Sequence, residues 1–332
     1  MKIVMFKAVV VGCGAIGGGR DLNSSFTHGG CYHYHDQIIL SAGVDKDEIQ
    51  ASRFSDRYGC YSDSDLLSVL NLYEPAVVSV CTSDETHYDI VRAILLSPHP
   101  PKVIFLEKPA CASVQQYETL LTMASDCGTV ILVNHSRRFN PHYSAIRERI
   151  ANFDFGRLIR VRSIYYAGWM HNGTHVIDTL SFLLDDSIRV KRIDNVLDSP
   201  YEGDPTIEVS ATLEKRMVPV EIGAIDETFY QLFEFDLWFE DARLRLEDFG
   251  ERIILERRVV NKSQERVLKI FPNHLPLRDK TAMEEAVYLI VAYLKTNDEG
   301  LLDGYRLQDI GPTMQALWEG QKLYEYYKPE TP

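Results

Sequence analysis

The sequence lacks any apolar run that approaches the roughly 20 residues needed to cross a membrane as a helix. It also lacks a Cys-x-x-Cys pair among its 6 cysteines, an internal repeat and a low-complexity linker. The first residues, MKIVMFKAVVVG, resemble a secretion signal only superficially, because Lys7 interrupts the apolar stretch and no small-residue cleavage site follows. These absences argue against a membrane protein and a disulfide scaffold, and we expect a cytoplasmic protein with reduced thiols.

Basic charge is scarce as well, since Lys+Arg 35 against Asp+Glu 48 give a formal net charge of −13. A nucleic-acid binder needs a basic surface, so this balance argues against nucleic-acid partners. It remains compatible with a small anionic substrate, because a local basic pocket can lie on an acidic protein. With 332 residues and 45% hydrophobic content, the chain is long enough for two domains with cores of their own.

The two halves of the chain differ in pattern. The first alternates helix-like segments with short runs that are apolar throughout, which is typical of a parallel sheet covered on both faces. Its expected strands are 7–12, 37–44, 76–82, 102–107 and 129–134. The second half has helices expected near 141–151 and 174–184 and two closing helices near 280–296 and 309–327. Its expected strands, with alternating polar positions, are 158–167, 206–213, 218–225, 231–240, 242–249 and 252–260. That alternation predicts an antiparallel sheet with one solvent-facing side.

The stretch VVVGCGAIG follows the first expected strand with Gly12, Gly14 and Gly17. Glycines at this spacing let the backbone turn tightly and approach a pyrophosphate, whose charge the helix N–H groups receive. We count Ala15 and Ile16, in the same turn, as cofactor-binding with them. The alternative is an ordinary glycine turn.

The residues after this turn mostly have low helix propensity and are unfavourable in a first helical turn. They include Gly18, Gly19, Arg20, Asp21 and Asn23. We therefore expect the helix to begin only near Ser25 or Thr27, after a longer loop.

Polar residues also follow the other expected strands. Asp45 ends the second strand, where a carboxylate can accept ribose hydroxyls and would repel a 2′-phosphate, so the expected cofactor is NAD, with NADP less favoured. Thr82 and Ser83 end the next strand at the carboxyl edge, where such sheets bind ligands. His87 lies one turn into the following helix and is either a cofactor contact or a helix-surface histidine.

The stretch KVIFLEKPA places Glu107 and Lys108 at the end of a buried strand, and Pro109 prevents that strand from continuing. Two charges at such a place are costly to bury unless they are paired or used. If the sheet binds a dinucleotide, Glu107 can hold a ribose hydroxyl and Lys108 can reach the substrate oxygen beside the transferred hydride. The structural alternative is a salt bridge between the two.

The order GxGxxG, Asp45, CTSDETH and EKP resembles that of the Gfo/Idh/MocA superfamily of NAD(P)-dependent oxidoreductases, which act mostly on sugars, inositols and sugar nucleotides. The resemblance implies that Lys108 is a catalytic-site lysine and that its bond to Pro109 is cis. It continues in SRRFNP, which contains Arg138, in WMHNGTHVIDTLSFLL, where Gly173, His175 and Asp178 match the family pattern, and in FEDARLRLED.

The implied fold is α/β. Residues 1–134 would form an N-terminal dinucleotide-binding Rossmann domain with a doubly wound parallel sheet. Residues 135–332 would form an α/β domain with an open, largely antiparallel sheet for substrate binding and oligomerisation, and the final helices can pack back on the first domain. The active site would lie between the domains, and the protein would be a homo-oligomer, a dimer or tetramer through the C-terminal sheet.

His175 is expected near a helix N-terminus, where the dipole disfavours imidazolium and leaves a neutral ring able to accept a proton. Lys108 would stabilise alkoxide character on the same substrate. The alternative is a packing or capping histidine. Many family members carry aspartate where this chain has His171, so we expect His171 to modulate proton transfer and Asp178 to replace that aspartate or bind a substrate hydroxyl. The predicted substrate-binding residues are Arg138, Trp169, His171, Asn172 and Asp178.

The segment THGGCYHYHD raises the question of a metal site. Its candidates His28, Cys31, His33 and His35 would scatter around a helix, and no second pair lies at zinc-finger distance, so we expect no metal. The leading function is an NAD-dependent oxidoreductase acting on a secondary alcohol or ketone of a sugar, sugar nucleotide or cyclitol. The alternatives are an NAD-dependent glycoside hydrolase or lyase with transient oxidation, and a non-catalytic sensor of dinucleotide or sugar.

Overall fold

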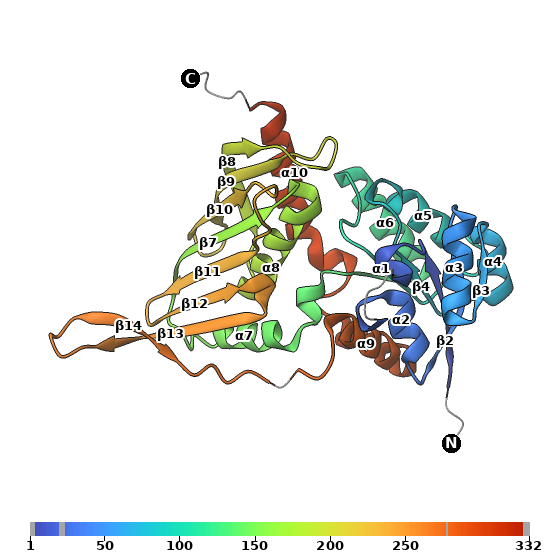
Figure 1. Ribbon diagram of the computed structural model, residues 1–332, viewed down its shortest axis with the longest axis horizontal. Coiled ribbons are helices and arrows are strands. Elements are labelled where there is room, and N and C mark those ends of the chain that lie inside the picture. The colour runs from blue at the N-terminus through green and yellow to red at the C-terminus, as the bar shows by residue number, and fades with distance from the viewer. Residues whose placement is uncertain (1–3, 20–23, 277, 328–332) are drawn as a thin grey trace. The chain divides into compact units, whose positions relative to one another are not determined.

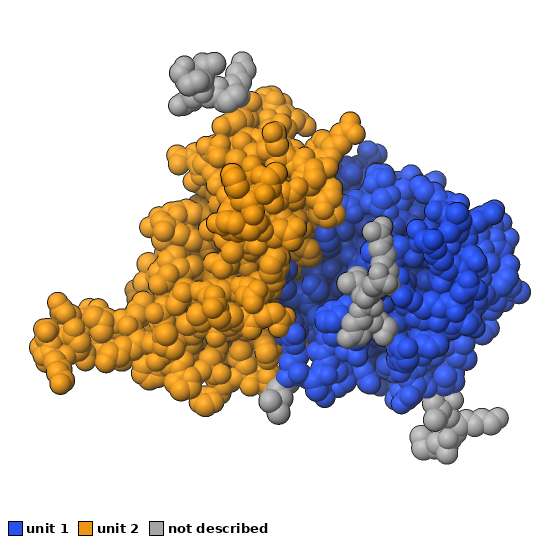
Figure 2. Space-filling view, viewed as in Figure 1, with its two compact units in different colours: residues 1–140, 278–310 blue, residues 141–277, 311–332 orange. Residues whose placement is uncertain are grey.

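The computed structural model describes residues 4–19, 24–276 and 278–327 (Figure 1). The chain forms two compact units, coloured separately in Figure 2. Unit 1 takes in residues 1–140 and 278–310, and unit 2 takes in residues 141–277 and 311–332. The first crossing thus falls after Asn140 rather than after Asn134, and of the two closing helices one belongs to each unit.

Unit 1 is built on a sheet of 6 parallel strands in the order β3-β2-β1-β4-β5-β6. The strands are β1 (Phe6–Val11), β2 (Ile38–Val44), β3 (Tyr61–Asp63), β4 (Val77–Val80), β5 (Val103–Leu106) and β6 (Val130–Val133). The helices between them are α3 (Glu48–Tyr58), α4 (Leu66–Tyr73), α5 (His87–Leu95) and α6 (Val114–Cys127). The strand order reverses between β1 and β4, which is the point where a doubly wound sheet binds its ligand.

The start of unit 1 departs from a regular strand–turn–helix. The helix after the glycines, α1 (Ala15–Gly18), has 4 residues. A second helix, α2 (His28–Tyr34), follows the short turn η1 (Ser24–Phe26), and Thr27 caps it by accepting the Gly30 N–H. A helix does begin at His28, close to the predicted Ser25 or Thr27, but the expectation that no helix precedes it was wrong, because α1 already includes Gly18. Arg20, Asp21 and Asn23 lie outside the described residues.

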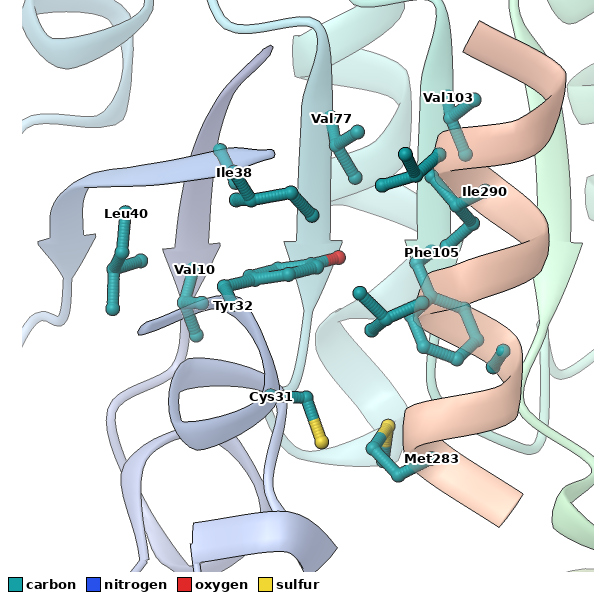
Figure 3. Close-up of a cluster of buried hydrophobic side chains, with 14 of the residues drawn as sticks. Val10, Cys31, Tyr32, Ile38, Leu40, Val77, Val103, Phe105, Met283 and Ile290 are labelled. Carbon is teal, nitrogen blue, oxygen red and sulfur yellow. The ribbon is translucent and has the colours of Figure 1, made fainter. Parts of the chain in front are cut away.

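Helix α9 (Ala282–Thr296) returns to unit 1 and covers part of its apolar core. Figure 3 shows Ile290 and Met283 of this helix facing Tyr32 and Phe105 in one buried cluster. The helix starts with a capping box, in which the Thr281 side chain accepts the Glu284 N–H and the Glu284 carboxylate accepts the Thr281 N–H. The α2 helix is therefore packed between the sheet and a segment from the far end of the sequence.

Unit 2 is built on a sheet of 8 strands in the order β14-β13-β12-β11-β7-β10-β9-β8, antiparallel except for the β7–β10 pair. Its strands are β7 (Leu158–Tyr166), β8 (Ile188–Leu197), β9 (Thr206–Leu213), β10 (Pro219–Ile225), β11 (Glu234–Phe239), β12 (Ala242–Glu247), β13 (Arg252–Val260) and β14 (Arg266–Phe271). Its helices are α7 (Pro141–Ala151), α8 (Thr174–Leu184) and α10 (Gly311–Glu325), and Figure 1 shows them together at the sheet. The predicted fold class is confirmed.

Three strands were not predicted, and all three lie at sheet edges: β3, β8 and β14. Edge strands face solvent on one side and tolerate charged residues, so their apolar pattern is weak. Within the described ranges, every helix is too short or too polar to span a bilayer.

Candidate functional site

The carboxyl ends of β1, β2 and β4 surround a cavity of about 390 Å³ in unit 1. Of the predicted cofactor-binding residues, it is lined by Gly12, Gly14, Asp45, Thr82 and Ser83. Gly12 directly follows β1, Asp45 directly follows β2, and Thr82 and Ser83 come shortly after β4, so parallel pairing brings residues far apart in sequence to one edge.

The glycines at this edge are required by close backbone approach. Gly12 has φ +90°, and a Cβ there would lie 2.6 Å from the Cys81 carbonyl. A Cβ on Gly17 would lie 1.8 Å from the Gly12 oxygen. A Cβ on Gly14, by contrast, would meet nothing within 4 Å. The turn therefore packs tightly against β4 and leaves open space at Gly14, which is the shape needed to cradle a bulky group such as a pyrophosphate. Ala15 is exposed and Ile16 half-buried in α1.

Asp45 is held between two loops. Its Oδ2 accepts the Cys13 N–H at 2.8 Å, and its Oδ1 accepts the Asp47 N–H at 3.0 Å. Each carboxylate oxygen has a further lone pair for a ribose hydroxyl. Lys46, which directly follows Asp45, also lines the cavity and was missed as a candidate. In the sequence, the one feature that indicates a role for Lys46 is its position directly after Asp45.

His87 does not occupy the place predicted for it. Its ring is fully buried, with Nδ1 2.7 Å from the Pro109 carbonyl oxygen and Nε2 3.1 Å from the Thr82 carbonyl oxygen. A ring enclosed in this way supports the ends of β4 and β5 instead of contacting a cofactor, which corrects the prediction. Thr82 itself accepts a hydrogen bond from the Thr86 hydroxyl at 2.8 Å.

Glu107 and Lys108 follow β5 and have different surroundings. Glu107 is buried, and its Oε1 lies 2.9 Å from His28 Nε2 and 2.6 Å from Asn134 Nδ2. Burial by itself raises the pKa of Glu107, but the hydrogen bond and charge of His28, the Asn134 amide and the Lys108 charge outweigh it, so the net shift is downward. Lys108 is half-buried, and its peptide bond to Pro109 is cis, as the family resemblance implied.

In unit 2, Trp169, His171 and Asn172 lie in a single π-helical turn, η4 (Trp169–Gly173), directly before α8, which carries His175 and Asp178. Both Asn172 and Gly173 donate their N–H groups to the Gly168 carbonyl at 3.0 Å. Short π-helical turns inside or beside α-helices are frequent at functional sites. His171, Asn172 and His175 are half-buried here, so each side chain keeps a solvent-accessible part.

Asp204 positions this turn and was missed from the sequence. Its two carboxylate oxygens accept the N–H groups of Met170 and His171, each at 2.8 Å. Burial raises the pKa of Asp204, against the lowering effect of these N–H bonds and of the His171 charge. A Cβ on Gly168 would lie 2.4 Å from the Asp204 Oδ2, so glycine is required at this point. The sequence signal for Asp204 is weak, since it is one acidic residue in a polar loop.

The ring of His171 stacks on Tyr201 of the same loop, with centroids 3.8 Å apart and planes 25° apart. The His175 ring meets the edge of Phe233 at 6.1 Å and 83°. His175 lies in the first turn of α8, as predicted. The two histidines are thus held by different loops.

Three predicted substrate-binding residues face the interior. Trp169 is 1% exposed, and its indole donates to the Leu317 carbonyl at 2.8 Å. Asp178 is also 1% exposed and accepts a hydrogen bond from Thr313 at 3.1 Å. Both contacts attach α8 and its preceding turn to α10, so direct sugar contact by these two side chains was a wrong prediction.

Arg138 is the third of these residues. It is buried in unit 1 and donates to the Gly304 carbonyl. Its guanidinium therefore joins the end of β6 to the returning C-terminal segment. Direct substrate binding by Arg138 was predicted wrongly as well.

The candidate metal residues point to separate environments. His28 contacts Glu107, the Cys31 thiol donates to the Ser25 carbonyl at 3.3 Å, His33 is exposed, and His35 Nδ1 accepts the Gln37 N–H at 3.1 Å. In the described part of the chain, no three His, Cys, Asp or Glu side chains are grouped to hold a metal ion. All 6 cysteines are free thiols.

Comparison with known proteins agrees with this geometry. The family model GFO_IDH_MocA, described as an oxidoreductase family with an NAD-binding Rossmann fold, matches residues 6–135. The inositol 2-dehydrogenase of Rhizobium meliloti (strain 1021) is 29% identical over 129 residues, which cover 38% of this chain and 36% of that protein. The match therefore spans just over a third of the relative's length.

Solved structures match over nearly the whole chain. The UDP-N-acetylglucosamine 3-dehydrogenase of Acidithiobacillus ferrooxidans has a TM-score of 0.71 at 13% identity and covers 96% of this chain and 98% of its own. A 3-ketoreductase of Actinomadura kijaniata, solved with TDP-benzene and NADP, has a TM-score of 0.75 at 12% identity, with 94% and 96% covered. At these identities the likeness shows the fold. The match of the Gfo/Idh/MocA family model to residues 6–135 confirms the resemblance that the motifs in this part of the chain predicted.

Proposed function

We propose that the protein is an NAD-dependent oxidoreductase acting on a secondary alcohol or ketone of a sugar, a sugar nucleotide or a cyclitol. The observation that carries the proposal is the cavity of about 390 Å³ at the switch point of the unit 1 sheet, with Asp45 held at its edge. The bound nicotinamide would supply hydride chemistry, which the side chains of the protein cannot supply. The names of the similar dehydrogenases support a sugar or cyclitol as the substrate class.

The preference for NAD over NADP rests on Asp45. Two backbone N–H groups hold its carboxylate at the cavity, and a fixed negative charge repels a 2′-phosphate while accepting ribose hydroxyls. Lys46 lines the same cavity and is the feature that supports NADP. We assign the preference to Asp45 because its geometry is fixed by two hydrogen bonds.

Lys108 is the residue we propose for charge stabilisation. It lies two residues after β5, whose carboxyl end lies at the same sheet edge as those of β1 and β4. Its ammonium would stabilise negative charge that develops on the reacting oxygen. Glu107, which stays ionised because its pKa is lowered, keeps a negative charge beside that ammonium.

His175 is the residue we propose for proton transfer. It is half-buried in the first turn of α8, where a neutral ring would offer a nitrogen to accept the alcohol proton. His171 and Asn172, on the preceding turn, are the side chains we propose for substrate hydroxyls. They replace Trp169 and Asp178 as the proposed substrate-binding residues, because the side chains of those two residues are buried.

Assembly and location are also proposals. The outward side of the unit 2 sheet carries paired charges, such as Arg162 with Glu221 and Arg243 with Asp236, and a second copy could cover such a mixed surface. A homo-oligomer, dimer or tetramer, would be seen by light scattering of the purified chain. The free thiols fit a reducing compartment such as the cytoplasm.

A melting screen with NAD, NADP and a panel of sugars, sugar nucleotides and inositols tests the function. A ligand that binds the folded state raises stability by RT ln(1 + [L]/Kd). Ligands that raise the melting temperature are then assayed for turnover, and net NADH formation supports the oxidoreductase. A changed sugar without net NADH would instead indicate the hydrolase or lyase, and binding without any product would indicate a sensor.

A further inference from the structure

The histidine segment that opens α2 has a role outside metal binding. His28 is 0% exposed, with Nδ1 2.8 Å from the Ser79 hydroxyl and Nε2 2.9 Å from Glu107 Oε1. The ring also packs on Phe105, with centroids 4.6 Å apart. A residue 79 positions from Glu107 in the sequence is therefore in direct contact with the residue that precedes Lys108.

The hydrogen bonds around His28 form a directed chain. Tyr32 and Ser79 hydroxyls lie 2.8 Å apart, and burial raises the pKa of Tyr32, so its proton is retained. In one arrangement Tyr32 donates to Ser79, Ser79 donates to Nδ1, and Nε2–H donates to Glu107, so that each of these buried groups has a partner.

Glu107 receives a second donor from the other side. Asn134, which follows β6, donates its amide to the same Oε1 at 2.6 Å, and the Glu107 N–H donates to the Val80 carbonyl at 2.9 Å. Helix α2 and the segment after β6 thus meet at one carboxylate oxygen, while β4 holds the backbone of the same residue.

Such a network is costly as a purely structural device. Removing a carboxylate from water costs several kcal/mol before its donors compensate, and apolar packing of similar volume often gives equal or greater stability. What an apolar residue could not supply is a negative charge next to Lys108. This difference points to a role in the chemistry of the Lys108 turn.

We propose that His28 is a positioning residue, which acts through Glu107 to hold the charge and direction of the Lys108 turn. The inference rests on the proposed function, in which Lys108 acts on the substrate. His28 itself is buried and touches no substrate.

The charged and titratable groups around Glu107 determine the expected pH effect. They are His28 of α2, Lys108 of its own segment and Cys81 at the end of β4, with Tyr32 acting through Ser79. His28 supplies the largest lowering contributions to the Glu107 pKa, and burial opposes them. Without His28, Glu107 takes up a proton at a higher pH, and Lys108 loses its neighbouring charge there.

The test compares His28→Phe, His28→Gln, Glu107→Gln and the double variant H28F/E107Q in the full chain. His33→Phe is the matched control, because His33 is an exposed histidine of the same helix. We measure kcat and KM for NAD and for the substrate found in the screen, from about pH 5 to 9. His28→Phe is expected to lower kcat by roughly 10- to 100-fold, with KM for NAD changed far less, as for misplacement of a reacting group.

Three further outcomes separate positioning from packing. The acidic limb of the kcat profile moves to higher pH in His28→Phe, His28→Gln restores part of the activity through its amide donor, and H28F/E107Q is no worse than Glu107→Gln because the two residues act as one unit. A pH-independent loss in His28→Phe, with effects that add in the double variant, would overturn the inference.

Failure of the proposed function is distinguishable. If the wild-type chain converts no substrate in the screen, the proposed function is wrong. The coupling between His28 and Glu107 is then tested by measuring the unfolding free energy as a function of pH. A lowered folded-state pKa makes Glu107 stabilising above its unfolded value of 4.5, and this stability is lost as pH falls through the folded pKa. His28→Gln and Glu107→Gln should both reduce this loss of unfolding free energy at low pH. The inference is wrong if the His28→Gln variant loses as much unfolding free energy at low pH as the wild-type chain.

Discussion

The imidazole of His171 lies flat on the ring of Tyr201, with centroids 3.8 Å apart. The same loop supplies Asp204, whose carboxylate accepts the His171 N–H at 2.8 Å. Backbone and ring of His171 are therefore both placed by a loop that follows β8 and precedes β9. His175, by contrast, is placed by the first turn of α8 and faces Phe233.

The two histidines should accordingly differ in kinetic importance. His175→Asn should lower kcat by ~10²–10⁴, the usual contribution of a general acid–base. His171→Asn should cost only about 2- to 10-fold, equivalent to one hydrogen bond of roughly 0.5–1.5 kcal/mol. His171→Asp should keep or raise activity. Steady-state measurement of kcat on the three variants tests this difference. Equal losses of kcat in His171→Asn and His175→Asn would mean that His175 is not the sole proton-transfer residue.

Gly168 is expected to be irreplaceable. Its φ is +82°, and a Cβ would displace Asp204 from the N–H groups it accepts, so Gly168→Ala should cost about 2–4 kcal/mol of unfolding free energy. Gly203→Ala is the matched control, since Gly203 has φ +74° and nothing within 4 Å of its Cβ position. The control should cost only about 1–2 kcal/mol. Urea unfolding of both variants measures the two losses of unfolding free energy. Equal losses would mean that the Asp204 side chain can move away from the added methyl group without a measurable energetic cost.

Lys108→Met keeps much of the side-chain length and removes its charge. Loss of one group that stabilises developing charge typically lowers kcat by ~10²–10³, roughly 3–4 kcal/mol. NAD affinity should change far less, because the glycine turn and Asp45 line a separate part of the sheet edge. Lys102→Met, at an exposed lysine just before β5, controls for loss of charge in the same segment.

The purely structural alternative for Lys108 gives the opposite pattern. If Lys108 only balances Glu107, then Lys108→Met lowers the melting temperature without a selective kinetic effect. Turnover, NAD binding and melting temperature are therefore measured on the same preparation. Normal turnover in a less stable Lys108→Met variant would remove the catalytic role.

Cofactor choice should depend on Asp45. Asp45→Ser removes the charge that opposes a 2′-phosphate and should improve NADP binding by at least about 10-fold, or roughly 1.4 kcal/mol, relative to NAD. Asp47→Ser is the control, because it removes a nearby exposed carboxylate while serine can still cap α3. Fluorescence titration with both dinucleotides measures the ratio. Tighter NADP binding by the wild-type chain would mean that Lys46, and not Asp45, dominates the cavity.

The sequence by itself determined five of the six strands of unit 1 and the edge at which its candidate cofactor residues meet. Strand and helix patterns are local, with periods of two and 3.6 residues, and parallel strands necessarily bring their carboxyl ends together. Gly12, Asp45 and Thr82 could therefore be assigned to one edge from their positions after three apolar runs. The EKP motif could be assigned to it for the same reason.

Only the tertiary structure decided which polar side chains face outward. Trp169, Asp178 and Arg138 looked like substrate contacts in the sequence, but their partners Leu317, Thr313 and Gly304 lie 148, 135 and 166 positions away. The reverse holds for Asp204 and His28, whose importance comes from contacts 33 and 79 positions away. Periodicity tells which side of an element a residue occupies, whereas burial depends on whether a distant segment covers that side, and no local pattern encodes the covering segment.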